Sequence, residues 1–453
     1  MTSLLYLTAG VMFIVGLKGL TGPRTARRGN AIASLGMLLA VVVVVVTLLD
    51  DDVVWWTIGA GLVVGGGIGA LLALRVQMTA MPQLVAAFNG FGGAASALVA
   101  AAEIVRTDGD FATETSVTVA LSIAIGTVTF AGSFVAYAKL QGLISGRPMG
   151  LPGGNVVNGV LLAGMTGVGT WAVIADEPTG YWILAGLSFL LGILAVLPIG
   201  GADMPVVISL LNSFSGVAAA MAGFVIGNLV LIIGGALVGA AGFILTMQMS
   251  EAMNRSLGNV LFSKFGGSTA VATGEQKPVK RASPEDVAIA LAYANRVLVV
   301  PGYGLAVAQA QHAVRDLATM LEERDITVGY AIHPVAGRMP GHMNVLLAEA
   351  DVPYEQLLDL DQSNPRFPQT DVVLVVGAND VVNPSARDDA TSSIYGMPIL
   401  EVDLAETVVV VKRSLSPGFA GIDNPLFYED KTMMLFADGK AGLEAVVAAL
   451  VDV

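Results

Sequence analysis

The chain has 453 residues, of which 55% are hydrophobic and 13% are charged, and its mean hydropathy is +0.73. Soluble domains carry about 25% charged residues, so this composition indicates a membrane protein. The absence of cysteine excludes disulfides, thiolate metal sites, iron–sulfur clusters and thiol catalysis, and a net charge of −13 argues against nucleic acid as a partner.

Apolar stretches fill the first part of the chain. A spanning helix needs ~20 apolar residues, because it crosses ~30 Å of hydrocarbon at about 1.5 Å per residue. We expect nine such helices, with soft boundaries, at residues 4–20, 31–49, 54–74, 84–105, 116–138, 156–175, 181–199, 205–225 and 228–248. Residues 1–263 are therefore predicted to form a membrane domain.

The connections between these helices alternate in charge. Basic residues follow the first, third, fifth and ninth helices, namely Arg24, Arg27, Arg28, Arg75, Lys139, Arg147, Arg255 and Lys264. Acidic residues follow the second and sixth, namely Asp50, Asp51, Asp52, Asp176 and Glu177. Because Lys and Arg concentrate in cytoplasmic loops, the odd connections and the C-terminal part are predicted to be cytoplasmic, with the N-terminus outside.

Few polar residues interrupt the apolar stretches, and each is a candidate for moving protons. Asn89 lies in the fourth predicted helix and Asn212 in the eighth, while Asp203 stands at the start of the eighth. Polar groups are expensive inside a membrane and often functional there. The alternative interpretation, that Asn89 and Asn212 only join helices by hydrogen bonds, stays open.

After residue 263 the composition changes. Residues 264–283 are predicted to be a linker, and Ser283 is predicted to cap a helix that opens a domain at residues 284–453. Strands are expected at 296–300, 327–333, 372–376, 398–402, 407–411 and 432–436, and helices at 305–322, 341–350 and 439–450. This alternation predicts a Rossmann-like α/β domain, with a parallel sheet covered on both faces.

A glycine-containing turn between the first of these strands and its helix indicates a nucleotide site. Gly302, Tyr303 and Gly304 form the turn, and Val307 occupies the place of a usual third glycine. Such turns let the backbone approach a pyrophosphate at a helix N-terminus. The pattern by itself is weak, and its setting between a strand and a helix is what supports the interpretation.

The preferred nucleotide is predicted from the ends of later strands. NAD sites carry an acid at the end of the second strand, but here that strand ends at residues 331–334 without one. Another predicted strand is followed by Lys412, Arg413 and Ser414, whose two positive charges and hydroxyl group suit a 2′-phosphate. The alternative interpretation is that these side chains are only solvated at the end of the strand. The loops 337–341 and 377–383 follow strands at the same edge, and Asn379 and Asp380 are either ligands or turn formers.

Several motifs resemble one known family. Residues 301–311, 333–349, 377–383 and 412–414, with 200–207, 212–216 and 252–256 in the membrane part, together resemble the proton-translocating NAD(P) transhydrogenase β subunit. The resemblance implies a partner α side, of one or two polypeptides, that binds NAD(H) and adds membrane helices. It also implies NADP(H) on this chain, direct hydride transfer between the nucleotides, coupled proton movement, a dimer of αβ units, and a bacterial inner membrane.

The resemblance also implies which residues contact NADP(H). They are Tyr303, Val335, Ala336, Gly337, Arg338, Met339, Pro340, Gly377, Ala378, Asn379, Asp380, Val381, Gly396, Met397, Lys412, Arg413, Ser414, Leu415, Ser416, Pro417, Gly418, Phe419, Asp438 and Gly439. Many relatives carry a titrating His where Asn89 stands, and this membrane part has no His. The titrating group is then expected from the α side, or from Asp203 through water.

Two other functions are compatible with parts of the pattern. A channel or transporter gated by a cytoplasmic nucleotide-sensing domain would share the nine helices and the α/β domain, but it would need no redox partner. A quinone-linked dehydrogenase would need a flavin, haem or cluster motif, and the sequence contains none of these.

Overall fold

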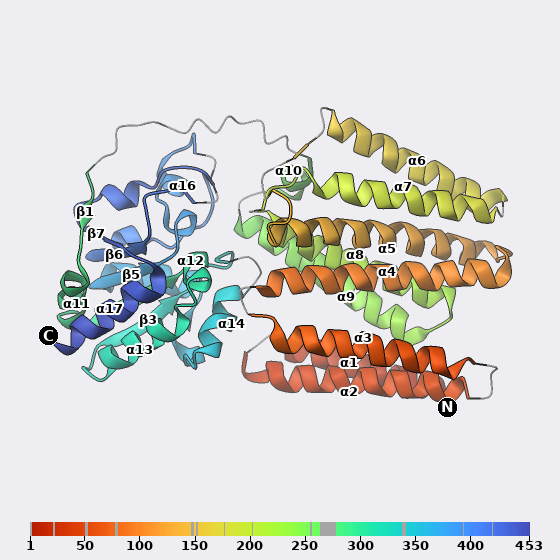
Figure 1. Cartoon of the computed structure of the whole chain (residues 1–453), viewed down its shortest axis with the longest axis horizontal. Helices are drawn as coiled ribbons and strands as arrows, with labels where there is room; N and C mark the ends of the chain where they lie inside the picture. The colour runs from red at the N-terminus through yellow and green to blue at the C-terminus, as the bar shows by residue number, and fades with distance from the viewer. Residues whose placement is uncertain are drawn as a thin grey trace. The chain divides into compact units, whose positions relative to one another are not determined.

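The computed structural model describes residues 2–20, 23–49, 53–77, 80–145, 149–150, 153–175, 177–201, 203–253, 256–262, 278–337, 341–392, 394–418 and 420–453, with backbone only at 23, 24 and 259. Contacts divide the chain into two compact units, Met1–Met247 and Gln248–Val453. The first is a bundle of helices and the second is built around a sheet (Figure 1).

The helices of the bundle agree with the apolar stretches of the sequence. Among the described residues, nine helices are long and apolar enough to cross a membrane. They are α1 Thr2–Gly19, α2 Pro23–Thr47, α3 Trp55–Arg75, α4 Met81–Thr107, α5 Thr113–Leu140, α6 Gly154–Ala175, α7 Pro178–Val196, α8 Met204–Val225 and α9 Leu229–Ala252. The predicted multi-span bundle is therefore confirmed, including the separate α7 and α8.

Small residues bring the central helices of the bundle close together. A Cβ atom on Gly93 of α4 would lie 2.7 Å from the Gly126 carbonyl oxygen of α5. A Cβ on Gly216 of α8 would lie 2.4 Å from the Gly239 amide nitrogen of α9. In lipid, where apolar burial does not drive helix association, such close backbone packing holds helices together.

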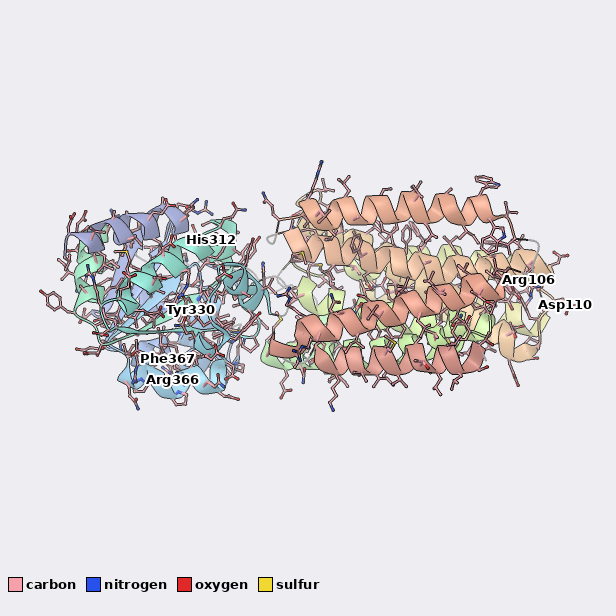
Figure 2. All side chains as sticks on the ribbon, turned by 90° about the horizontal axis from the view of Figure 1, so that it is seen from below. Arg106, Asp110, His312, Tyr330, Arg366 and Phe367 are labelled. Atoms are coloured by element: carbon pink, nitrogen blue, oxygen red, sulfur yellow. The ribbon has the colours of Figure 1, made fainter. Side chains whose placement is uncertain are left out.

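The charge pattern that predicted the orientation of the bundle is only partly covered by the structure. Asp50, Asp51, Asp52, Arg147, Asp176, Arg255 and Lys264 lie outside the described residues. At the predicted outer ends of α4 and α5, Arg106 and Asp110 lie together at one end of the bundle (Figure 2). Arg106 donates to Glu103 one turn earlier, through Nε at 2.8 Å.

The second unit contains a parallel sheet, as predicted. Seven strands within the described residues form it in the order β1-β7-β6-β5-β2-β3-β4, and every neighbouring pair is parallel. The strands are β1 Lys280–Arg281, β2 Arg296–Pro301, β3 Thr327–Ala331, β4 Leu357–Leu358, β5 Val372–Val376, β6 Thr407–Lys412 and β7 Thr432–Phe436.

Helices and 3-10 turns connect these strands. A short helix, α10 Leu257–Phe262, precedes the predicted linker, whose residues 264–277 lie outside the described residues. The α-helices are α11 Pro284–Ala292, α12 Tyr303–Val307, α13 Gln311–Glu322, α14 His342–Glu349, α15 Leu360–Ser363, α16 Ser385–Asp388 and α17 Gly439–Val451. The 3-10 turns are η2 Tyr354–Gln356, η3 Asn364–Gln369, η4 Asp380–Val382, η5 Val402–Leu404 and η6 Pro425–Tyr428.

The two faces of the sheet are covered differently. On one face, helix α17 contacts both α11 and α13, and the helices α11, α13 and α17 touch strands β7, β3 and β6 respectively. On the other face, Leu298, Val373 and Val408 pack with Phe367 of η3 and Phe427 of η6. Figure 2 shows Tyr330 of β3 and Phe367 inside this unit, where both are fully buried. Because both faces of the sheet are buried, the central strands are nearly continuous runs of Val and Leu.

Three details of the predicted α/β domain were wrong. Residues 398–402 are not a strand: Ile399 and Leu400 are buried against neighbouring loops, so their apolar pattern reflects packing rather than strand pairing. The helix predicted at 305–322 is two helices, because Gln309 takes a φ of 51° between α12 and α13. The two-residue edge strands β1 and β4 were missed, and β1 uses residues of the predicted linker.

Candidate functional site

The order of the strands places the candidate site at one edge of the sheet. Strand β2 lies between β3, the next strand in the chain, and β5, the third strand after β2. The connections from β2 and from β5 therefore leave in opposite directions, and in open α/β sheets ligands bind in the crevice that such a reversal forms at the carboxyl ends of the strands. The loops that begin at Gly302 and at Gly377 emerge at that point.

Three glycines let these two loops interlock. The Gly302 amide donates to the Val376 carbonyl and the Gly304 amide to the Gly377 carbonyl, both at 2.9 Å. A Cβ on Gly302 would lie 2.4 Å from Ala378 Cα, and one on Gly377 would lie 2.4 Å from Gly304 Cα. Gly377 also has a φ of 67°, which other residues adopt only with strain. The glycine pattern thus fixes the floor of the crevice by close backbone packing.

The helix that follows this floor is short. It begins at Tyr303 and ends at Val307, whose side chain is 46% exposed. A third glycine would serve close packing of helix on strand, and the outward side chain of Val307 removes that requirement. Gly439, after β7, completes this side of the crevice, since its Cβ would lie 3.1 Å from the Ala308 methyl group.

The loop after β3 is held by two buried histidines. Gly337 has a φ of 109°, and a Cβ there would meet His342 Nδ1 at 2.6 Å. The His342 ring lies 6.4 Å from the Tyr303 ring, measured between centroids. The predicted contacts Val335, Ala336 and Gly337 are thereby brought beside the Gly302 loop, whereas Arg338, Met339 and Pro340 lie outside the described residues.

His333 joins this loop to the segment before η5. Its Nδ1 accepts the Val335 amide proton at 3.2 Å, so its Nε2 carries a proton and donates to the Pro398 carbonyl at 2.7 Å. The ring is 1% exposed, and burial lowers the pKa of His333 to about 4, against a smaller opposing effect of the Pro398 hydrogen bond. His333 is therefore a neutral structural link.

This neutral histidine predicts how stability depends on pH. Because the folded pKa lies below that of an unfolded histidine, about 6.5, the unfolded chain takes up the proton first. Stability from His333 should be complete above about pH 6.5 and should fall as the pH drops toward about 4, by at most about 3 kcal/mol. The chain has three histidines, so ¹⁵N-histidine spectra can follow each one. An imidazolium signal from His333 at pH 6 would contradict this assignment.

Lys412 closes the end of β6. Its Nζ donates to the Ser416 carbonyl at 2.5 Å and lies 4.8 Å from the centre of the Phe427 ring. Burial lowers the pKa of Lys412 to about 8, while the carboxylates of Asp380 and Asp423 oppose that shift. Arg413 and Ser414, the next two residues, are exposed at the same strand end. Of the predicted basic pair, Lys412 therefore shapes the loop and Arg413 faces outward.

The loop after Lys412 rests on the loop after β5. The Asp380 carboxylate accepts the Ala420 amide proton at 2.9 Å, and a Cβ on Gly418 would lie 2.4 Å from Asp380 Oδ1. The Asn379 side-chain amide lies 2.7 Å from the Gly418 nitrogen and 3.0 Å from Lys412 Nζ, and it accepts from both when its oxygen faces them. The loop from Lys412 to Gly418 is thus held over Asn379 and Asp380, next to Val381. It contains three further predicted contacts, Leu415, Ser416 and Pro417.

Asn424 belongs to this loop arrangement and was missed by the sequence analysis. It is 1% exposed, its Nδ2 donates to the Asn379 carbonyl at 3.2 Å, and its side chain caps η6 by accepting the Leu426 amide proton. The Asn-Pro pair that opens η6 is a helix-start signal that could have drawn attention to it. Phe419, a predicted contact, lies outside the described residues.

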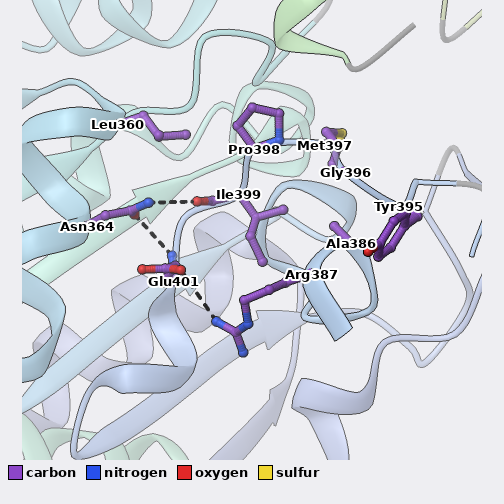
Figure 3. A pocket seen from close by; sticks show the side chains of 10 residues that line it. All are labelled: Leu360, Asn364, Ala386, Arg387, Tyr395, Gly396, Met397, Pro398, Ile399 and Glu401. Atoms are coloured by element: carbon purple, nitrogen blue, oxygen red, sulfur yellow. Dashed lines mark hydrogen bonds and ion pairs between the residues drawn. The ribbon is translucent and has the colours of Figure 1, made fainter. Parts of the chain in front are cut away.

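Gly396 and Met397 line a separate hollow beside the His333 loop. This pocket of about 350 Å³ is also lined by Arg387, Tyr395 and Ile399, and Figure 3 shows how these side chains surround it. The Gly396 amide donates to the Ala386 carbonyl at 2.7 Å, and Gly396 has a φ of 78°. Arg387 is fixed by Asp403 at 2.7 Å and by Asp388 at 2.8 Å.

Asp438 lies at the carboxyl end of β7 and caps α17. Its Oδ1 accepts the Lys440 amide proton at 3.1 Å. Asp438 and Gly439 therefore lie where β7 ends and α17 begins, at the same edge of the sheet as the carboxyl ends of β2, β3, β5 and β6. The described residues of the predicted nucleotide site are therefore gathered from five strand ends, apart from the adjoining pocket at Gly396 and Met397.

A second polar site lies inside the bundle and contains Asn89. Asn89 of α4 donates through Nδ2 to Ser133 Oγ of α5 at 3.0 Å, and its Oδ1 accepts from Ser215 Oγ of α8 at 2.7 Å. These three side chains are called the Asn89 cluster below. Asn212 is half-buried on α8, one turn before Ser215, and Asp203 is 1% exposed just before α8 begins.

Ser133 and Ser215 were not predicted as part of this site. Their hydroxyl groups are common in spanning helices, and no local pattern pairs them with an asparagine 44 or 126 residues away. Asn89 was found because a lone amide in an apolar helix is unusual.

Comparison with known proteins identifies the family. A family model described as NAD(P) transhydrogenase beta subunit matches residues 2–449. Two curated relatives described as NAD(P) transhydrogenase subunit beta, both from Rhodospirillum rubrum, are each 47% identical to this chain over 461 aligned residues. Each alignment covers 99% of this chain and 99% of the relative. This chain belongs to the NAD(P) transhydrogenase β-subunit family.

Proposed function

We propose that this β subunit binds NADP(H) at the carboxyl edge of its sheet and exchanges hydride directly with NAD(H) held by an α partner. The exchange is coupled to proton movement across the bacterial inner membrane, with the sheet domain on the cytoplasmic side. The functional unit is a dimer of αβ units. The observation that carries the proposal is the reversal of strand order at β2 and β5, where two glycine loops interlock, with the exposed Arg413 after the neighbouring strand β6.

The residues present fit a phosphorylated dinucleotide. The interlocked glycines leave backbone rather than side chains at the floor of the crevice, where a pyrophosphate can approach. The loop after β3 offers the neutral His333 rather than a carboxylate, so nothing there favours a free ribose 2′-hydroxyl. Arg413 and Ser414 supply a guanidinium and a hydroxyl for a 2′-phosphate.

The protein contributes position and water exclusion to the hydride step. NADP(H) itself supplies the carbon that takes or gives the hydride, so the chain needs no acid, base or nucleophile for that step. The loop from Lys412 to Gly418, held on Asp380 and Asn379, is placed to cover a bound nucleotide. Its contacts can also hold the nucleotide until the partner domain presents its own ring.

Proton movement is proposed to pass the Asn89 cluster. An amide cannot hold a proton at neutral pH, but Asn89, Ser133 and Ser215 can orient water in an otherwise apolar region. Asn212 extends this polar surface along α8. The titrating group comes from the α partner's helices, or from Asp203 through a chain of water molecules.

The test of the function is hydride exchange between NADPH and an oxidised NAD analogue. The chain should catalyse exchange only when the partner's NAD-binding domain is added, because each nucleotide is held by a different subunit. A nucleotide-gated transporter without redox chemistry would bind NADPH and yet show no exchange with the partner present. That result would reject the proposed reaction.

Replacing Asn89 with Leu should reduce proton translocation by about tenfold or more, because the apolar side chain removes the two hydrogen bonds that the Asn89 amide group makes to Ser133 and Ser215. Translocation is measured by dye quenching in vesicles that contain the complete complex. Asn158→Leu is the matched control, since Asn158 of α6 donates to Leu194 of α7 and lies outside the cluster. Equal translocation by Asn89→Leu and wild type would remove the cluster from the path.

A further inference from the structure

Lys139 is a buried cation at one end of the bundle. Basic residues occupy the last turns of α1, α3, α4 and α5, namely Lys18, Arg75, Arg106 and Lys139. The first three are exposed, as expected for side chains that reach from a helix end toward water, whereas Lys139 is 4% exposed. A buried cation in a membrane bundle needs a specific reason.

The Lys139 ammonium caps a different helix. Its Nζ donates to the Leu197 carbonyl at 2.5 Å and to the Ile199 carbonyl at 2.7 Å. These carbonyls lie just beyond the end of α7, where the helix leaves acceptors unpaired and its dipole favours a positive charge. The Met149 amide, from the connection after α5, also donates to Leu197 at 3.2 Å.

The capped segment leads directly into the start of α8. Three residues separate Ile199 from Asp203, which is buried, and α8 begins at Met204. Lys139 therefore fixes the beginning of α8 to the end of α5. On the neighbouring helix α4, Gln83 donates to the Leu140 carbonyl at 3.2 Å and ties the end of α5 to the start of α4.

These end contacts act on the helices that build the Asn89 cluster. Ser133 lies six residues before Lys139 on α5, and Ser215 lies on α8 beyond the capped turn. A slip of α8 by one helical turn would move Ser215 by about 5.4 Å and separate it from Asn89. The hydrogen bond between Ser215 and Asn89 is 2.7 Å long and tolerates no such movement.

We infer that Lys139 is a positioning residue for proton translocation, which holds the α7–α8 turn against α5 so that Asp203, Asn212 and Ser215 keep their places relative to Asn89 and Ser133. The inference rests on the proposed function, because translocation is its readout. It assigns Lys139 no contact with a nucleotide and no part in hydride transfer.

The test compares Lys139→Met with Lys139→Arg in the complete complex with its α partner. The Met variant should lower dye-quench translocation by about tenfold, and the Arg variant, which can still donate to both carbonyls, should retain at least about half. Both should bind NADPH as wild type does. Hydrogen exchange of residues 197–204 should rise in the Met variant and return toward wild type in the Arg variant.

Asn158→Leu provides the matched control, because Asn158 Nδ2 donates to Leu194 near the same end of α7, at 3.4 Å. It should leave translocation unchanged. The inference is overturned if Lys139→Met translocates like wild type, or if the control loses as much. Should the Met variant fail to assemble, Lys139→Gln replaces it, and wild-type translocation by that variant overturns the inference equally. A wild-type complex that moves no protons would instead refute the proposed function.

Discussion

Replacing Arg413 with Ala is expected to raise the Kd for NADPH roughly 10- to 100-fold, while the Kd for NADH changes little. A hydrogen bond from a guanidinium to a phosphate is charge-assisted on both sides, and only NADPH carries the 2′-phosphate. Arg413 is the better target than Lys412, because Lys412 also holds the covering loop through Ser416. Isothermal titration of the complete chain in detergent measures both Kd values.

Arg366→Ala is the matched control for the Arg413 substitution. Arg366 is an exposed arginine on η3 of the same unit, and Figure 2 shows its place there. The control separates the loss of one positive charge from the loss of a specific contact, so its NADPH affinity should match that of wild type. If Arg413→Ala weakened NADH and NADPH equally, Arg413 would not read the 2′-phosphate.

Replacing Gly377 with Ala is expected to destroy the nucleotide crevice. The new methyl group would lie 2.4 Å from Gly304 Cα and from the Leu305 nitrogen, both on backbone that cannot move aside. Overpacking of this kind costs about 1–3 kcal/mol, and the φ of 67° adds about 1–2 kcal/mol for a residue with a Cβ. NADPH binding should be lost, and hydrogen exchange at the amides of β2 and β5 should quicken.

Gly341→Ala isolates the steric part of that effect. Gly341 has nearly the same φ, 68°, but a Cβ there meets none of the residues that the structure describes within 4 Å. Gly341→Ala should therefore lower the free energy of unfolding only by the cost of the backbone conformation, about 1–2 kcal/mol. Equal destabilisation by the two substitutions would show that backbone conformation, rather than interlocking of the Gly302 and Gly377 loops, explains the glycine at position 377.

The large elements were predictable from sequence because each has a strong local signal. Spanning helices and buried strands are continuous apolar runs of characteristic length, and the runs at 372–376 and 432–436 matched the strands residue for residue. Residues 398–402 carry the same signal and yet form no strand, since burial alone produces it. The break at Gln309 depends on a single backbone angle, and the edge strands β1 and β4 are too short for any periodicity.

The loops that form the candidate site could be predicted from sequence, but the residues that these loops contact could not. Glycine turns and polar residues after strands mark a sheet edge, so Gly302, Gly377 and Arg413 could be placed there from sequence. The partners of those loops are distant in the chain: Asn424 binds a carbonyl 45 residues earlier, and Lys139 binds carbonyls 58 and 60 residues later. In the sequence, Lys139 is one of several basic residues that follow a helix, and only the structure shows that it is buried.

The most direct test compares the affinities of the complete chain for NADPH and NADH, without any partner. A crevice that selects the phosphate should bind NADPH at least about 100-fold more tightly than NADH. Equal affinity for the two nucleotides, or binding of neither, would contradict a site for NADP(H) at the carboxyl ends of β2 and β5.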